Sequence, residues 1–457
     1  MLELPDTFYL RTFGCQMNEH DSERIAGMLD SMGLRRVVQA QAADVLVYNT
    51  CSIREKADTR LLGHLGEARR LKSRGQAKLV VVAGCLAQSR RESFFEEHPY
   101  VDVLVGPQSL HELPELILSR IEQSAASLPA PAPAAALAER TECFSAELPR
   151  VRSDGPLAWV QIMTGCTNYC SYCIVPYVRG PEASRPADDI LAEIRSLVDQ
   201  GVREVTLLGQ NVNAYGSEEE APPGPDFAGL LNQVSAVEGL RRIRFMTSHP
   251  KDVSPDLIRA LAELEPVCEH LHLPVQSGSN RILAAMRRGY TREHYLDLVG
   301  ALRSAVPEIS LTTDLIVGFP GETEEDFKET LDLVEEVGFD AAFTFIYSPR
   351  MGTRAAALPG RISPETADER MTRLVETVRR AALARNQALI GRRVEVLVEG
   401  PSRNSGDEWA GRTRTFKMVN FAATSTKPPS AGDLVEVEIS AGTSASLRGR
   451  VVGSRAA

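Results

Sequence analysis

Two signals of a membrane or secreted protein are missing from this sequence of 457 residues. It has no hydrophobic run that approaches the length of a membrane-spanning helix, which argues against a membrane protein. Its first residues, 1–6, do not combine a basic region with an apolar one, so they do not predict a secretion signal. We therefore expect a cytoplasmic protein.

An excess of positive charge is missing as well. The formal net charge is −10, which argues against a uniformly basic nucleic-acid-binding protein but leaves room for a local basic patch. Hydrophobic residues make up 43% of the chain, which is enough for real cores, and the length predicts two to four domains.

A fourth metal ligand is missing from the most distinctive stretch of the chain. Cys166, Cys170 and Cys173 follow the pattern C-x3-C-x2-C after the apolar run 159–165, and no other Cys or His lies within twenty residues on either side. Thiolates at this density favour an iron–sulfur cluster or zinc, and a structural zinc site needs four ligands. Three cysteines would hold three irons of a [4Fe–4S] cluster and leave the fourth iron open. The alternatives are a zinc ribbon that lacks a ligand and a surface disulfide with a spare thiol.

This spacing resembles that of the radical S-adenosylmethionine (SAM) enzymes. In that superfamily the open iron binds the amino and carboxyl groups of SAM, and an electron from the cluster splits SAM into methionine and a 5′-deoxyadenosyl radical. The cofactors carry this chemistry and the protein positions them.

Residues 6–122 alternate between apolar strand patterns and helical patterns, which predicts a doubly wound parallel sheet covered on both faces. The first helix is predicted from Asn18, as its N-cap, to Met32. Cys15, Cys51 and Cys85 each stand at the C-terminal end of a predicted strand. Such ends share one edge of a parallel sheet, so we expect the three thiols to meet there. The alternative is three buried structural cysteines.

Residues 123–150 are rich in Pro and Ala and predict a semi-rigid linker, in which Cys143 has no expected role. Residues 151–383 contain six strand patterns separated by amphipathic helices, so they predict an open parallel sheet or an incomplete TIM-like (βα)6 barrel. The cysteine loop after the first strand favours the barrel. Polar residues at the strand ends are candidates for binding SAM: Gly209, Gln210, Asn211, Ser248, Gln276 and Asp314. We interpret His249 and Glu322 as ordinary turn residues and Cys268 as structural.

Residues 384–453 follow a long Arg-rich helix and contain five short strand patterns, which predict a small antiparallel β-barrel. Residues 385–457 hold eleven Lys and Arg against seven Asp and Glu, so this part carries +4 and the remaining 384 residues carry −14. A basic barrel on an acidic enzyme predicts an RNA-binding element. The alternative is a solvated β-domain whose surplus has no function.

Taken together, these parts resemble the radical-SAM methylthiotransferases, whose domains are an N-terminal methylthiotransferase domain, a radical SAM core and a TRAM domain. The resemblance covers essentially the whole chain. Several strings are similar to the bacterial tRNA branch of the family: Thr12 to Glu19 (TFGCQMNE), Cys173 to Gly180 (CIVPYVRG), Ser184 to Pro186 (SRP), Leu208 to Asn213 (LGQNVN), His272 to Ser279 (HLPVQSGS), Gly411 to Thr413 (GRT) and Val419 to Phe421 (VNF). The long Pro/Ala linker is a departure that leaves the cysteines untouched.

The resemblance implies a transferase that converts N6-isopentenyladenosine, beside the anticodon of tRNA, to its 2-methylthio derivative. It implies two [4Fe–4S] clusters: Cys166, Cys170 and Cys173 hold the one that generates the radical, and Cys15, Cys51 and Cys85 hold the one that handles sulfur. One SAM would supply the methyl group and a second the radical. Tyr169, Tyr172 and Tyr177 are candidates for stacking on the target base, and the alternative is that they are core residues. A reductant such as flavodoxin or ferredoxin and a monomeric state are also expected.

Other functions stay open at this stage. Within the family, the substrate could be an aspartate of a ribosomal protein or threonylcarbamoyl-adenosine, although the barrel and the string Gln16-Met17-Asn18 argue against both. From another class, the chain could be an iron–sulfur electron carrier or redox sensor with an RNA-binding tail. Cleavage of SAM by the reduced protein would separate an enzyme from a carrier.

Overall fold

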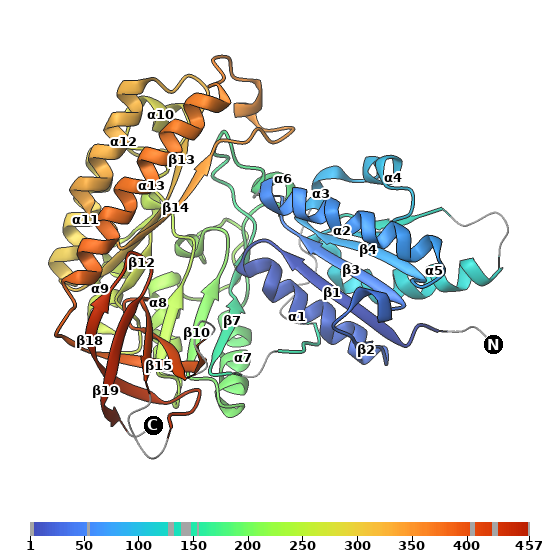
Figure 1. Ribbon diagram of the computed structural model, residues 1–457, viewed down its shortest axis with the longest axis horizontal. Helices are drawn as coiled ribbons and strands as arrows, with labels where there is room; N and C mark the ends of the chain where they lie inside the picture. The colour runs from blue at the N-terminus through green and yellow to red at the C-terminus, as the bar shows by residue number, and fades with distance from the viewer. Residues whose placement is uncertain are drawn as a thin grey trace. The chain divides into compact units, whose positions relative to one another are not determined.

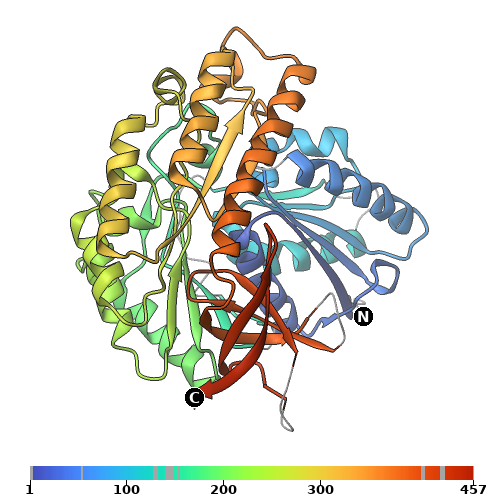
Figure 2. The ribbon, with the colours of Figure 1, turned by 60° about the vertical axis from the view of Figure 1, so that its left-hand side comes forward.

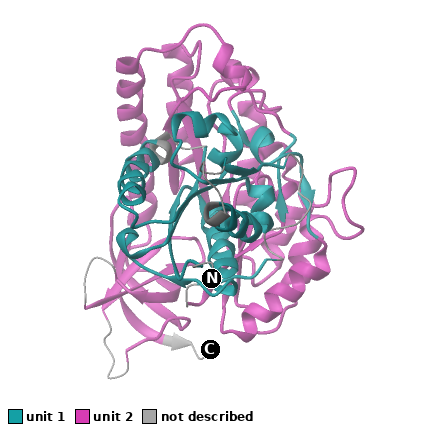
Figure 3. Ribbon diagram, turned by 90° about the vertical axis from the view of Figure 1, so that its right-hand side faces the viewer, with its two compact units in different colours: residues 1–153, 163–167, 173–185 teal, residues 154–162, 168–172, 186–457 magenta. Residues whose placement is uncertain are grey.

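The computed structural model describes residues 4–52, 55–126, 132–138, 148–152, 155–402, 407–422 and 428–455. Cys143 lies outside them. The chain divides into two compact units, coloured separately in Figure 3. Unit 1 comprises residues 1–153, 163–167 and 173–185, and unit 2 comprises residues 154–162, 168–172 and 186–457. The division therefore runs through the loop that carries Cys166, Cys170 and Cys173.

Unit 1 is built on a parallel sheet in the order β2-β1-β3-β4-β5-β6. Its strands are β1 (Thr7–Phe13), β2 (Arg35–Arg36), β3 (Val45–Thr50), β4 (Leu79–Gly84), β5 (Val103–Val105) and β6 (Ala134–Ala136). Its helices are α1 (Gln16–Ser31), α2 (Glu55–Ser73), α3 (Cys85–Arg90), α4 (Ser93–Glu97) and α5 (Leu113–Ala126). The order in which β1 lies between β2 and β3 is that of a doubly wound fold, as predicted.

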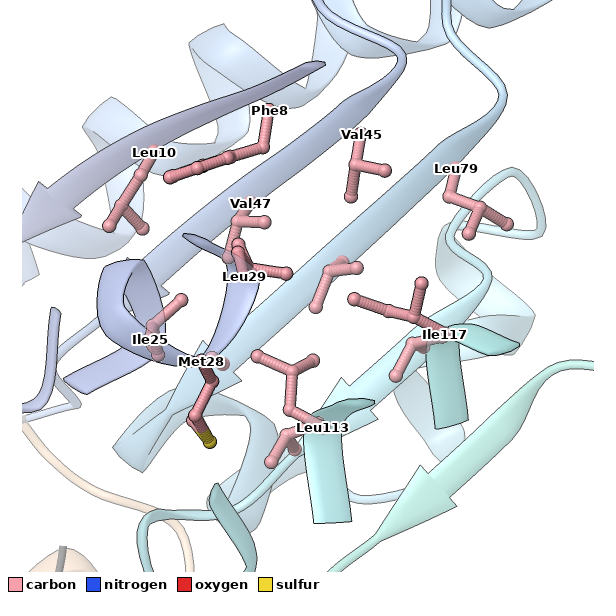
Figure 4. Packing of buried hydrophobic residues seen from close by; sticks show 14 of the residues in the cluster. Phe8, Leu10, Ile25, Met28, Leu29, Val45, Val47, Leu79, Leu113 and Ile117 are labelled. Carbon is pink, nitrogen blue, oxygen red and sulfur yellow. The ribbon is translucent and has the colours of Figure 1, made fainter. Parts of the chain in front are cut away.

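Side chains alternate between the two faces of this sheet because successive residues of a strand point in opposite directions. Val45 and Val47 pack with Leu29 of α1 and Ile117 of α5, in the cluster drawn in Figure 4. The intervening Leu46 belongs to the cluster that α2 and α3 cover on the opposite face. Strands β3, β4 and β5 are therefore buried on both faces, which fixes their register.

Two expectations for this unit were wrong. Asn18 does not cap α1: the helix begins at Gln16, Cys15 occupies the N-cap position, and Asn18 is buried in the first turn. The segment predicted as a linker contains β6, which pairs with β5 in parallel and extends the sheet. The three alanines of β6 offered no alternation of apolar and polar residues from which a strand could be predicted.

Unit 2 contains six parallel strands in chain order, β7 (Leu157–Gln161), β10 (Glu204–Leu208), β11 (Arg242–Phe245), β12 (His270–His272), β13 (Ser310–Val317) and β14 (Ala341–Ile346). A parallel bridge between Ile243 and Val267 joins the two three-stranded halves. The helices between and after them are α7 (Ala187–Asp199), α8 (Phe227–Ser235), α9 (Pro255–Glu263), α10 (Asn280–Ala285), α11 (Arg292–Ala305), α12 (Glu324–Val337) and α13 (Pro364–Gln387). Repeated strand–helix units in sequential order form the predicted partial barrel.

The helix α13 leads into a closed barrel of five strands, visible at the red end of the chain in Figures 1 and 2. They are β15 (Arg393–Pro401), β16 (Glu408–Thr413), β17 (Met418–Ala422), β18 (Leu434–Gly442) and β19 (Leu447–Arg455). All of the pairs are antiparallel, as predicted, except β17 and β19, which run parallel and close the barrel.

Two buried arginines attach this barrel to the six-stranded part of unit 2. Arg242 donates to the carbonyl of Arg412 at 2.7 Å, and Arg244 donates to the carbonyls of Thr413 and Arg414 at 2.7 and 2.6 Å. Glu204 accepts from Arg244 at 2.9 Å and lies 3.7 Å from Arg242. Buried polar groups of this kind are stable only when they are paired, so the barrel and the strands fold as one body.

Packing in unit 1 gives the first prediction. Replacing the fully buried Leu29 by Ala should destabilise the sheet of unit 1 by about 2–5 kcal/mol, because a cavity opens between α1 and β3. Leu62→Ala on α2 removes the same atoms from an exposed position and should cost much less. Hydrogen exchange of β3 and β4 amides in increasing denaturant measures both variants. Equal protection in the two would contradict the packing described here.

Candidate functional site

The first candidate site lies at the carboxyl edge of the sheet in unit 1. Cys15 follows β1, Cys51 follows β3 and Cys85 follows β4, so the three thiols come from three adjacent strands. Ligands of doubly wound folds bind at this edge where the strand order reverses, which here is between β1 and β3. Sequence reasoning predicted this arrangement from the strand-end positions alone.

Two of these cysteines, Cys15 and Cys85, directly follow a glycine at which the backbone turns. Gly14 has φ +146°, and a Cβ on it would lie 2.4 Å from the Cβ of Cys51. Gly84 has φ +93°, and a Cβ on it would lie 2.4 Å from Oδ1 of Asn49. Any other residue would clash and be strained, so both positions require glycine.

Two buried asparagine side chains, Asn18 and Asn49, form a hydrogen-bond network beside Cys15. The Cys15 thiol donates to Oδ1 of Asn18 at 3.3 Å, and Nδ2 of Asn18 donates to Oδ1 of Asn49 at 3.2 Å. Nδ2 of Asn49 donates in turn to the Asn18 carbonyl and to the Ser22 hydroxyl. The network therefore fixes the start of α1 against the end of β3.

Arg179 is a buried cation at this site. Arg179 donates from Nε to Sγ of Cys85 at 3.4 Å and from Nη2 to Oδ2 of Asp21 at 2.8 Å. A hydrogen bond with Cys51 and, to a smaller extent, the charge of Arg179 lower the pKa of the Cys15 thiol to about 6, although burial acts in the opposite direction. Burial raises the pKa of Cys85. Cys15 is therefore more readily present as a thiolate than Cys85.

The second candidate site is the loop between two short strands of unit 1, β8 (Met163–Thr164) and β9 (Ala183–Ser184), which pair antiparallel. The loop carries Cys166, Cys170 and Cys173 and the short helix α6 (Val175–Val178). The amide of Cys166 donates to the carbonyl of Gly180 at 3.1 Å. Cys170 is buried, and Cys166 and Cys173 are partly exposed.

The three tyrosines that were candidates for stacking differ in exposure. Tyr169 and Tyr177 are 44% and 47% exposed, whereas Tyr172 packs against the apolar cluster around Met286.

The polar candidates for SAM binding follow successive strands of unit 2. Gly209, Gln210 and Asn211 come after β10, Ser248 after β11 and Gln276 after β12, and Asp314 lies in β13. Backbone hydrogen bonds bring them together in two groups: Val212 donates to the carbonyl of Thr247, and Gln276 donates to that of Asp314 at 2.9 Å.

Three features of these strand ends suit a ligand. The Ser248 hydroxyl is buried and has no hydrogen-bond partner among the described residues. Thr247 and Gln276 both have φ +75°, which strains a non-glycine residue and is typical of functional sites. The carboxylate of Asp314 is partly exposed and lies 3.5 Å from Nε2 of His272.

The residues expected to be structural have structural contacts. Glu322 accepts from the Gly318 amide and forms a buried ion pair with Arg370 at 2.8 Å. His249 accepts from the Lys251 amide, and burial together with the charges of Arg288 and Lys251 lowers its pKa to about 2. Cys268 is buried between β11 and β12, and burial raises its pKa to about 11.

The ligands available at the two cysteine sets are thiols, the ligand type that an iron–sulfur cluster takes. Among the described residues, no three His, Cys, Asp or Glu side chains converge closely enough to hold one ion. A [4Fe–4S] cluster places a different iron on each cysteine, so its ligands need not converge on one point. The candidate ligands at each site are therefore cysteine thiols alone.

Known proteins are similar to this chain along nearly its whole length. Residues 7–106 match the Uncharacterized protein family UPF0004, residues 160–334 the Radical SAM superfamily and residues 387–452 the TRAM domain. The chain is 49% identical over 454 residues to the tRNA-2-methylthio-N(6)-dimethylallyladenosine synthase of Moorella thermoacetica, covering 99% of this chain and 100% of that protein. It is 46% identical over 449 residues to the synthase of the same name from Clostridium perfringens, covering 97% of each. The chain belongs to this family.

Membership confirms the resemblance to the radical-SAM methylthiotransferases, and the chain is a transferase of the radical SAM superfamily. Among solved structures, it is similar to the radical SAM methyltransferase TsrM from Kitasatospora setae, with a TM-score of 0.55 and 16% identity over 77% of this chain and 74% of that one. At that identity the similarity concerns the fold alone. No helix of the described residues has the length and hydrophobicity needed to cross a membrane.

The ion pair at the first site gives the second prediction. Arg179→Met should destabilise unit 1 of the cluster-free protein by about 3–5 kcal/mol, because Asp21 stays buried without this cation. Adding Asp21→Asn should restore part of the loss, so the double variant costs less than the sum of the two single ones. Hydrogen exchange of β1 and β3 amides in denaturant measures all three. Strictly additive losses would argue against the pairing.

Proposed function

We propose that this enzyme methylthiolates N6-isopentenyladenosine next to the anticodon of tRNA, giving 2-methylthio-N6-isopentenyladenosine. The observation that carries the proposal is identity of 45–49% over nearly the full length to synthases named for this product, including all three parts of the chain. No comparable similarity supports a ribosomal protein aspartate or threonylcarbamoyl-adenosine as the substrate. None supports a non-catalytic iron–sulfur electron carrier or redox sensor either.

The two cysteine sets would each hold one [4Fe–4S] cluster. Cys166, Cys170 and Cys173 would hold the cluster whose electron is used to cleave SAM, and Cys15, Cys51 and Cys85 would hold the one that handles sulfur. The position of the second set at the switch point of its sheet supports this assignment. The target C–H bond is aromatic and has no acidic proton, so radical chemistry suits it better than acid–base catalysis.

Residues of unit 2 would bind SAM. The buried, unpartnered hydroxyl of Ser248 is available as a donor for its carboxylate, and the partly exposed carboxylate of Asp314 is available as an acceptor for its ammonium group. Gly209, Gln210, Asn211 and Gln276 would line the same strand ends. The reductant and the oligomeric state remain predictions.

The basic surface proposed for tRNA is smaller than the charge count suggested. In the barrel, Arg414 and Lys417 pair with Glu269 and Asp340 of the same unit at 2.7 and 2.6 Å. Arg448 and Arg450 on β19 are highly exposed and make only long ion pairs of 3.4 Å. We therefore assign the contact with tRNA phosphates to these two residues.

The product is tested by mass spectrometry of digested tRNA. Transfer RNA from cells that lack this gene should retain the isopentenyl group and lose the methylthio group. Complementation with the wild-type gene should restore the methylthio group, and Cys170→Ala should not. Methylthio-adenosine that persists in the deletion strain would overturn the proposed function.

The division of labour between the cysteine sets is tested by paired substitutions. Cys170→Ala should abolish reductive cleavage of SAM to 5′-deoxyadenosine, because alanine cannot ligate iron. Cys51→Ala should keep that cleavage measurable while thiolation of tRNA disappears, and it should lower the iron content from about eight to about four per chain. Cys268→Ala is the matched control and should change neither activity nor iron content. If Cys51→Ala also stops SAM cleavage in protein that retains the other cluster, the assignment is wrong.

A further inference from the structure

A second buried arginine, Arg288, contacts Cys170, and both residues belong to unit 2. Arg288 is 5% exposed and uses all three guanidinium nitrogens. Nη1 donates to Sγ of Cys170 at 3.3 Å, Nε donates to the Tyr290 hydroxyl at 2.9 Å, and Nη2 donates to the Pro274 carbonyl at 2.9 Å. The planar fork of an arginine is fixed in place by three such contacts.

The end of α10 places Arg288 and the cysteine loop together. Arg287 has φ +59°, and the amides of Arg288 and Arg287 donate back to the carbonyls of Leu283 and Ala284. This is the Schellman arrangement, in which the left-handed position is usually glycine. The carbonyls of Ala285 and Met286 accept from the hydroxyl and the amide of Ser171, at 2.8 and 3.0 Å. The C-terminal end of α10 thus binds Ser171 and places the Arg288 guanidinium beside the neighbouring Cys170.

Arg288 has no carboxylate partner among the described residues. The groups around it are Cys170, Tyr172, Tyr290 and His249, and His249 is neutral at physiological pH. Burial acts against its charge, yet interactions with Tyr172, Tyr290 and Cys170 hold the pKa of Arg288 well above its ordinary value. An isolated buried cation is costly unless an anion compensates it.

The site in unit 1 differs in this respect. Arg179, which donates to Cys85, also forms a buried ion pair with Asp21, so its charge is already compensated by a carboxylate. The two cysteine sets therefore have different local charge: an arginine with a carboxylate at Cys85, and an arginine without one at Cys170.

We infer that Arg288 is the counter-cation of the cluster held by Cys166, Cys170 and Cys173, and that it raises the reduction potential of this cluster. The inference rests on the proposed function, which assigns the cluster to these cysteines. Reduction adds one electron from an external low-potential donor, and no bond forms or breaks. The added negative charge is stabilised by a fixed cation and by an N–H donor to a ligand sulfur, two factors that set cluster potentials.

The test is a potentiometric titration of the full chain carrying Cys51→Ala, so that a single cluster is observed by electron paramagnetic resonance with dithionite as reductant. Adding Arg288→Gln should make reduction at least tenfold less favourable, a shift of about 59 mV to lower potential for a one-electron couple. Arg288→Lys keeps the charge and should shift less. Arg287→Gln removes the same charge from the exposed neighbour and should leave the potential unchanged.

These outcomes show whether Arg288 acts on the cluster through its charge or only through packing. An unchanged potential in iron-loaded Arg288→Gln protein overturns the inference. If Arg288→Gln fails to retain iron, Arg288→Lys must retain it at a potential close to that of the parent, and equal loss from both variants overturns the inference too. Absence of any cluster from the Cys51→Ala parent, which keeps Arg288, would instead contradict the proposed function.

Discussion

The cysteine site of unit 1 and the polar strand ends of unit 2 depend on one constraint of parallel sheets, which is that the residue after every strand emerges at the same edge. In unit 1 this constraint gathers Cys15, Cys51 and Cys85, although more than thirty residues separate each from the next. In unit 2 polar residues follow successive strands, Ser248 after β11 and Gln276 after β12. Backbone pairing thus brings together groups that no local motif connects. In unit 1, the apolar cluster in Figure 4 stabilises that pairing on one face of the sheet.

The same constraint explains how much could be predicted from the sequence. The order of strands and helices, the six-stranded partial barrel and the strand-end positions of the cysteines follow from apolar periodicity and turn residues, which are local signals. The strand β6 could not be predicted, because Ala134 to Ala136 are short, apolar and weak β-formers. Asn18 was misread as a helix cap because its residue type suits that position, whereas its actual partner, Asn49, is thirty-one residues away.

The two arginines that contact cysteine sulfurs could not be predicted from the sequence, because these contacts also join residues that are far apart in the chain. Arg179 is six residues after Cys173, inside a string that the sequence singled out, but it contacts a sulfur ninety-four residues away in the chain. Arg288 is 118 residues from Cys170. The one available signal was the pair Arg287-Arg288 directly after an apolar helix, which reads as a solvated helix end. Only three-dimensional contacts separate the exposed arginine from the buried one.

Ion pairs within unit 2 reduce the number of basic residues of the barrel that are available to bind RNA. Its surplus of basic residues suggested a broad RNA-binding surface, yet Arg412, Arg414 and Lys417 are committed to ion pairs, and the backbone of β16 accepts hydrogen bonds from Arg242. Deleting the barrel would therefore leave Arg242 and Arg244 without the carbonyls that they donate to. A loss of tRNA binding in such a truncation would mix damage to unit 2 with loss of phosphate contacts. Point substitutions at Arg448 and Arg450 separate the two effects, because these side chains are exposed and contact no buried group.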